Sequence, residues 1–181
     1  MSNEIVLSNS QEEACTAFRK WLRNKDSMEF LLSGFAGSGK SFLVSYLIDF
    51  VRDEYRILRV IDRNIKPTNF HFTATTNKAA GVLSDMLQAP TKTIHTALGL
   101  VLRQERNGKG TYLEQKNDPV DLNHSVLVID EASMVNTELL EIVRETAKKH
   151  RDCKILYVGD SYQLPPVKEN TCPIFSRTED V

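Results

Sequence analysis

The chain has 181 residues, of which 41% are apolar and 26% are charged, and its formal net charge is −1. This length is enough for one hydrophobic core and short for two full domains, and the composition excludes a disordered or membrane-embedded chain. A nearly neutral chain has no general attraction to nucleic acid, so any contact with DNA must come from locally placed side chains.

The N-terminal segment and the cysteines bear on location. Residues 1–11 contain neither the basic region nor the apolar run of a secretion signal, and no apolar stretch elsewhere approaches the length that spans a bilayer. We therefore expect a cytoplasmic protein with no membrane partner. Cys15, Cys153 and Cys172 share no spacing typical of a disulfide framework or a zinc site, so we expect reduced, partly buried thiols.

The spacing of apolar residues predicts helices alternating with strands, which is the pattern of a parallel α/β sheet with right-handed crossovers. The stretch 55–65 fits either an extension of the preceding helix or a separate strand. The expected elements are, in chain order, a helix at 11–23 capped by Ser8 or Ser10, a buried strand at 28–33, a helix from 41, a strand at 70–75, a helix at 78–87, a short helix at 93–100, a hairpin centred on Asn107-Gly108, a buried strand at 125–129, a helix at 136–149 and a buried strand at 154–158.

A glycine-rich loop, residues 34–41, lies between a predicted strand and a predicted helix. Its glycines let backbone N–H groups approach phosphate oxygens, Lys40 adds a positive charge at the β and γ phosphates, and the Ser41 hydroxyl can ligate Mg²⁺. The alternative, a glycine-rich turn with an incidental lysine, is disfavoured by the flanking strand and helix. The candidate nucleotide contacts in this loop are Gly34, Gly37, Ser38, Gly39, Lys40 and Ser41.

Polar side chains also follow two later predicted strands, at the edge where open parallel sheets bind ligands. Asp130 would hold Mg²⁺ and Glu131 would polarise the attacking water, although a solvated acidic turn before a helix has the same composition. Gln163, in the loop after the strand at 154–158, can both donate and accept hydrogen bonds and so sense a γ-phosphate. The alternative there is a loop made rigid by two prolines.

The ordered set of motifs resembles a known family. Residues 34–41, Asp130-Glu131-Ala132-Ser133-Met134, and Gly159-Asp160 with Gln163-Leu164-Pro165-Pro166-Val167 are similar to motifs I, II and III of superfamily 1 helicases, most closely the RecD/Dda-type 1B branch. The resemblance spans residues 11–167. It implies an α/β, three-layer P-loop NTPase fold of the RecA-like type, ATP and Mg²⁺ as cofactors, 5′ to 3′ DNA unwinding, and a role for Gln11 in reading adenine.

The resemblance also implies a track for single-stranded DNA. Residues 73–80 and 93–96 resemble motifs Ia and Ib, with Thr75 standing where the family commonly has proline. By composition alone, His95 would be a packed histidine and Asn77-Lys78 a solvated helix start. We expect weak, sequence-tolerant and salt-sensitive binding. The candidate DNA contacts are Thr75, Thr76, Asn77, Lys78, His95 and Thr96.

Between motifs Ib and II the resemblance places a small β-hairpin insertion at 100–122, which separates strands ahead of the motor. The alternative is a tolerated surface insertion. The residues suited to DNA there are Arg103, Arg106, Lys109 and Lys116 for phosphates and Tyr112 or Leu113 for stacking.

The family's second motor domain has no counterpart in residues 1–181, so we expect a partner domain, and possible replication or recombination proteins as further partners. A competing hypothesis is a nucleotide-gated DNA- or protein-binding module that does not turn over ATP. A small-molecule kinase ranks last, because no segment offers a lid over an acceptor substrate.

Overall fold

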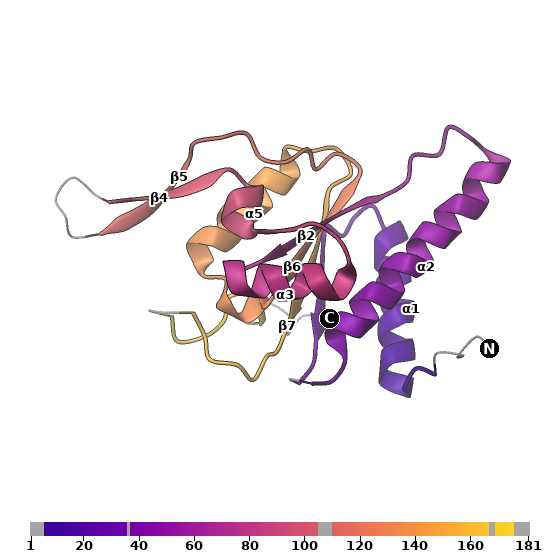
Figure 1. The fold of residues 1–181 in the computed structure, drawn as a ribbon, viewed down its shortest axis with the longest axis horizontal. Coiled ribbons are helices and arrows are strands. Elements are labelled where there is room, and N and C mark those ends of the chain that lie inside the picture. The colour runs from indigo at the N-terminus through magenta and orange to yellow at the C-terminus, as the bar shows by residue number, and fades with distance from the viewer. Residues whose placement is uncertain (1–5, 36, 105–109, 167–168, 176–181) are drawn as a thin grey trace.

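The computed structural model describes residues 6–35, 37–104, 110–166 and 169–175 (Figure 1). Its helices are α1 (Asn9–Arg23), α2 (Lys40–Ile61), α3 (Asn77–Leu87), α4 (Ile94–Ala97), the short 3₁₀ helix η1 (Ala132–Met134) and α5 (Thr137–Lys148). Its strands are β1 (Glu29–Ser33), β2 (Asn69–Ala74), β3 (Thr91–Thr93), β4 (Leu100–Gln104), β5 (Thr111–Gln115), β6 (Ser125–Asp130) and β7 (Lys154–Gly159).

Within the described residues, the main sheet has the strand order β1-β7-β6-β2-β3, and every pair of neighbours is parallel. The last strand in the chain, β7, is inserted between β1 and β6. Because parallel strands end at the same edge, the loops that follow β1, β7 and β6 lie in that order along one edge of the sheet. The prediction of a central parallel sheet is confirmed.

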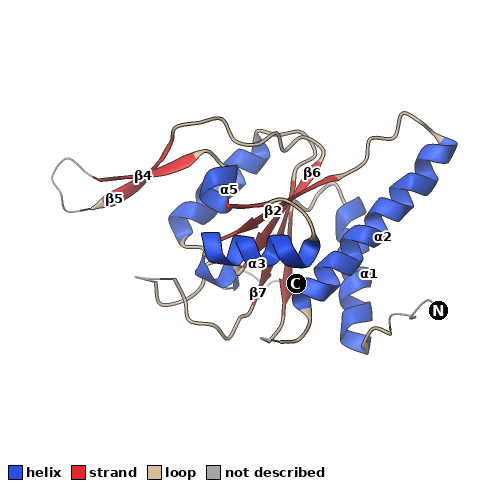
Figure 2. Cartoon of the chain, in the orientation of Figure 1, coloured by secondary structure: helices blue, strands red, loops and turns tan. Residues whose placement is uncertain are grey.

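Helices cover both faces of this sheet and make three layers (Figure 2). On one face α1, α2 and α3 pack on β6 and β7; this core includes Phe18, Leu47, Leu83, Val128 and Leu156. On the other face α4 and α5 pack on the same strands; this core includes Ile94, Leu140, Ile129 and Ile155. The residues of β6 alternate between the two cores, as the two-residue period of a strand requires. The three-layer α/β prediction is therefore confirmed.

Helix α1 is fixed at both ends. At its start Ser8 and Gln11 form a reciprocal capping box, which decides between the two predicted caps. At its end the Lys154 ammonium donates to the carbonyl oxygens of Trp21, Asn24 and Ser27 at 3.2, 2.6 and 2.7 Å. A cation at the carboxyl end of a helix satisfies orphan carbonyls and the helix dipole. This contact ties α1, and with it Gln11, to strand β7 of the sheet.

At three places the structure resolves an ambiguity in the predicted elements or differs from the prediction. The ambiguous stretch 55–65 extends α2 to Ile61. The helix expected at 93–100 shortens to the four-residue α4, because Gly99 in a left-handed conformation (φ +68°) turns the chain into β4. The strand at 28–33 was predicted to be buried, and this is wrong for most of its length. It is an edge strand, so only Leu32 is fully buried.

The three cysteines are free and buried, which confirms the prediction of reduced thiols. Among the described helices, none combines the length and the apolar composition needed to cross a bilayer.

Candidate nucleotide site and adjoining groove

The phosphate-binding loop is shaped by its glycines. Gly37 and Gly39 adopt left-handed conformations with φ of +77° and +80°. A side chain at Gly34 would place its Cβ 2.8 Å from the Ser38 hydroxyl, while open space surrounds Gly37. Ala36 lies outside the described residues. The loop therefore directs the N-terminus of α2, with its unpaired N–H groups, at an open concavity, which is the arrangement that binds anions.

Lys40 spans this loop. Its ammonium donates to the carbonyl oxygens of Gly34 and Phe35 at 2.7 and 2.8 Å. The loop is thereby held closed by the same charge that would meet a phosphate. A bound phosphate must compete with these two carbonyls for the ammonium.

Gln11 lies beside the same loop. Its side-chain Nε2 would be 3.3 Å from a Cβ on Gly39, and its Oε1 accepts the Ser8 backbone N–H. The structure thus brings the predicted adenine-reading residue to the start of α2. Adenine recognition itself stays a prediction.

The two carboxylates stand at the end of β6. Burial raises the pKa of the Asp130 carboxyl above its usual value, and the Glu131 charge adds to the rise while Lys40 opposes it. Glu131 has a left-handed backbone with φ of +53°, an uncommon conformation for a residue other than glycine that is frequent at functional sites. Its Oε2 accepts the Thr75 hydroxyl at 3.4 Å. A residue of the predicted DNA track therefore touches the predicted catalytic base.

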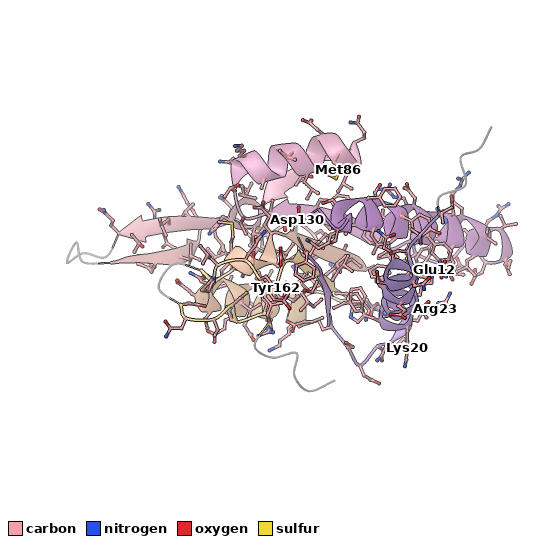
Figure 3. All side chains as sticks on the ribbon, turned by 90° about the horizontal axis from the view of Figure 1, so that it is seen from below. Glu12, Lys20, Arg23, Met86, Asp130 and Tyr162 are labelled. Atoms are coloured by element: carbon pink, nitrogen blue, oxygen red, sulfur yellow. The ribbon has the colours of Figure 1, made fainter. Side chains whose placement is uncertain are left out.

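A cavity of about 400 Å³ opens between these carboxylates and α3. Ser41, Asp130 and Glu131 line its polar side, together with Thr76 and Lys78 from the start of α3. The exposed side of α3 forms its apolar wall, and Figure 3 shows Met86 on that helix beside Asp130. Of the predicted DNA contacts, Thr76 and Lys78 thus share a cavity with the carboxylates.

Gln163 is held by the motif that carries the carboxylates. The Ser133 hydroxyl donates to Gln163 Oε1 at 2.6 Å, and the Gln163 backbone N–H bonds the Asp160 carbonyl at 3.2 Å. The two segments pack closely at Gly159, where a Cβ would lie 3.3 Å from the Ser133 backbone nitrogen. Because the Gln163 amide oxygen already accepts the Ser133 hydroxyl, its amide nitrogen is the group that can donate to a phosphate oxygen.

Residues missed by the sequence analysis connect these loops. Ser133 was quoted only as part of a motif, and its position there does not reveal that Gln163 is its partner. The ring of Phe35 stacks on the ring of Tyr162, with centroids 4.8 Å apart and planes at 19°. This stack joins the phosphate-binding loop to the Gln163 loop. The sequence signal that could have indicated this contact was the presence of an aromatic residue in each of the two loops.

Four of the six predicted DNA contacts line two cavities, and Thr76 lines both. A groove of about 270 Å³ is lined by Thr75, Thr76 and His95, together with Leu113 of the hairpin and Met134. Burial lowers the pKa of His95, so its imidazole is neutral at pH 7 and can stack or share a hydrogen bond. Asn77 is the first residue of α3, whereas Thr96 bonds Thr93 within α4 at 2.8 Å. These last two are not among the residues that line the groove.

The predicted hairpin is present as the antiparallel pair β4 and β5, which projects from the sheet (Figure 1). Leu102 and Tyr112 are exposed on it. Arg103 is ion-paired with Glu114 at 2.8 Å, so its charge is already partly neutralised. Lys116 lies at the base, where its N–H bonds the Gly99 carbonyl. Arg106, Asn107-Gly108 and Lys109 lie outside the described residues.

The glycine-rich loop follows β1, the carboxylates follow β6, and β7 lies between these two strands. This arrangement defines a P-loop NTPase domain of the RecA-like type. A family model described as an AAA domain matches residues 6–172, and the chain belongs to this family. The proteins that the chain is similar to include DNA helicases of the Pif1 and Dda types. Membership implies nucleotide binding and, typically, a divalent metal.

Two sequences and one structure illustrate the relationship. The chain is 30% identical to the ATP-dependent DNA helicase PIF1 of Candida albicans, over 98% of this chain and 18% of that protein. It is 28% identical to the ATP-dependent DNA helicase dda of Enterobacteria phage T4, over 93% of this chain and 35% of that protein. A crystal structure of Bacteroides Pif1 bound to ssDNA has the same fold, with a TM-score of 0.58 at 20% identity, covering 92% of this chain and 34% of that one. The chain therefore spans about a third or less of the length of these relatives.

Proposed function

We propose that this chain is the first motor domain of an ATP-dependent DNA helicase that moves 5′ to 3′ on single-stranded DNA. One observation carries the proposal. The loops after β1, β6 and β7 bring Lys40, Glu131 and Gln163 to one edge of the sheet. The groove formed by Thr75 and His95 adjoins that edge through the contact between Thr75 and Glu131. A nucleotide site and a strand-binding site that share a hydrogen bond are what a nucleic-acid motor needs.

The residues present fit Mg-ATP. The open space at Gly37 suits phosphates, and the half-buried Asp130 carboxyl lines the same cavity as Ser41. Ser41 and Asp130 would hold Mg²⁺, which neutralises phosphate charge when bound. Lys40 would exchange its two carbonyl partners for phosphate oxygens.

Each remaining predicted residue has a matching task. Gln11, beside Gly39, would hydrogen-bond the adenine. Glu131 would accept the proton of the attacking water, and Gln163 would donate its amide to the terminal phosphate. The pocket walls formed by Val82 and Met86 would limit access of bulk water to Glu131.

The proposed DNA track uses few charges. Thr75 and Thr76 would bond phosphates or sugars, and the neutral His95 would stack on a base, so binding is sequence-tolerant. The projecting β4–β5 hairpin would act as the strand-separating element. The second motor domain and replication or recombination proteins are proposed partners in the cytoplasm.

A nucleotide-gated binding module is the second candidate. It is favoured by the contacts of Lys40 and Glu131 with the chain's own groups, which hold both side chains in a resting arrangement. ATP hydrolysis by this chain, measured with and without oligothymidylate, separates the two candidates. Hydrolysis that is stimulated by DNA supports the enzyme, whereas nucleotide binding with no hydrolysis supports the module. A chain that binds no nucleotide refutes both.

Two substitutions sharpen this test. Glu131→Gln is expected to keep nucleotide affinity and abolish turnover, and Lys40→Ala is expected to weaken nucleotide binding itself. Glu145→Gln, an exposed acid-to-amide change on α5, is the matched control and is expected to leave both unchanged. Full turnover in Glu131→Gln would reject that residue as the base.

A further inference from the structure

The carboxyl-terminal half of α2 projects from the body of the molecule, at the end opposite to the β4–β5 hairpin (Figure 1). The fully buried residues of α2 all lie at or before Val51, and Tyr55 is the last residue that packs against the core, so residues 56–61 extend beyond it. This extension nevertheless carries large apolar side chains, with Val60 85% and Ile61 81% exposed and Ile57 on the same side of the helix. Contiguous exposed apolar side chains mark surfaces that bind other molecules.

A cavity of about 690 Å³ runs between this helix end and the segment that leads back to β2. The walls are joined by the Thr68 hydroxyl, which donates to the Tyr55 hydroxyl at 2.8 Å. Val60 and Pro67 contribute apolar surface to the lining. The cavity is also lined by four arginines, namely Arg52, Arg56, Arg59 and Arg63.

The charge of these arginines is poorly compensated. Arg52 and Arg56 reach the exposed carboxylates of Asp49 and Asp53 at 3.5 and 3.2 Å. Exposed pairs of this kind contribute little in water. Arg59 and Arg63 form no ion pair with any residue that the structure describes, and no carboxylate is among the residues lining the cavity. The cavity is therefore a concentrated guanidinium site, suited to carboxylates or phosphates.

We propose that this cavity and the adjoining face of α2 bind a segment of a partner protein in which aspartate or glutamate is interspersed with large apolar residues. Carboxylates would pair with Arg59 and Arg63, and apolar side chains would cover Val60 and Pro67, which line the same cavity. A phosphodiester backbone would satisfy the arginines but leave this apolar surface exposed. The proposed DNA groove is a separate cavity, lined in part by residues of the β4–β5 hairpin, and that hairpin projects at the opposite end of the molecule from the tip of α2 (Figure 1). The surface therefore favours an acidic, partly apolar peptide over nucleic acid, independently of the helicase proposal.

Fluorescence anisotropy with this chain tests the proposal. The probe is a labelled synthetic peptide in which Asp and Glu alternate with Leu and Phe. Comparison probes replace its acids by Lys, replace its apolar residues by Ser, or consist of labelled oligothymidylate. The variants are Arg59→Glu combined with Arg63→Glu, and Val60→Ser. Lys20→Glu, an exposed charge reversal on α1 (Figure 3), is the matched control.

The acidic apolar peptide is expected to bind, and the double arginine reversal to weaken it by about tenfold or more, because two attractions become repulsions. Val60→Ser should weaken it by about threefold, since it removes apolar contact without changing charge. Lys20→Glu should have no effect. Equal binding of the serine-substituted peptide, preferential binding of oligothymidylate, or self-association of the chain through this face would each overturn the proposal. Unchanged circular dichroism and nucleotide affinity in the variants show that loss of binding is local.

Discussion

The aromatic stack between Phe35 and Tyr162 restrains the loop that carries Gln163. Its rings lie 4.8 Å apart at 19°, while the two residues are 63% and 78% exposed, so little of the hydrophobic core depends on the contact. Aromatic pairs of this geometry contribute about 0.5–1.5 kcal/mol beyond area burial. Phe35→Ala should therefore raise the opening equilibrium of residues 161–163 by about two- to tenfold.

Hydrogen exchange of the nucleotide-free chain, followed by mass spectrometry, measures this opening. Phe35→Ala should speed exchange at residues 161–163 and leave α5 unchanged, while Phe35→Tyr should preserve the native rate because it keeps the stack. Tyr162→Ala combined with Phe35→Ala should add little to either single change, since both remove one contact. Native exchange rates at 161–163 in Phe35→Ala would refute the restraint. Faster exchange throughout α5 would show general unfolding instead.

Three further predictions concern the hairpin, the catalytic base and pH. Gly99 has a left-handed conformation, and a Cβ there would lie 2.1 Å from the backbone oxygen of Asn117. Gly99→Ala should therefore lower the free energy of unfolding, measured in urea, by about 2 kcal/mol or more. Gly81→Ala, in helix α3 with open space around it, should instead raise the free energy of unfolding. Thr75→Val removes the hydrogen bond to Glu131 and should raise DNA-free ATP hydrolysis by about two- to tenfold, and an unchanged rate would deny that Thr75 restrains the base. Burial lowers the pKa of folded His95, so the unfolded chain binds more protons; stability should fall as pH drops from above 6.5 through the folded pKa, and less steeply in His95→Gln. Equal pH slopes in urea unfolding would contradict the last prediction.

The loops that carry the chemistry were predictable because short-range rules fix them. Glycines between an apolar strand and an amphipathic helix specify the phosphate-binding loop around Lys40. An apolar run ending in acids specifies the carboxyl end of β6 at Asp130. Ser8 or Ser10 ahead of an amphipathic pattern predicts a capped helix start, and the structure selects Ser8. In each case the deciding residues are neighbours in the sequence, so no knowledge of the chain path was needed.

Features that depend on distant pairing were not predictable in the same way. The insertion of β7 between β1 and β6 pairs Glu29 with Ile155, 126 positions further along the chain (155 − 29), and no periodicity encodes that pairing. The three residues of β3, Thr91–Thr93, show no apolar alternation, so the sequence does not indicate a strand there. β1 has the apolar composition of a central strand but only one neighbour, and its exposure follows from topology alone. Thus the sequence indicates which segments are strands better than it indicates where they stand in the sheet.

The site shows the same contrast between features fixed by neighbouring residues and features fixed by distant pairing. Lys40, Glu131 and Gln163 each have an intramolecular partner: the Phe35 carbonyl, the Thr75 hydroxyl and the Ser133 hydroxyl. The last two contacts join motifs that lie far apart in the chain, so residue types and spacing could name the catalytic groups without naming what holds them. Because each group is already engaged, the proposed function requires nucleotide and DNA to displace these internal partners before the groups can act. Under that proposal, coupling between the two ligands would depend on these three displaceable contacts as much as on the motifs themselves.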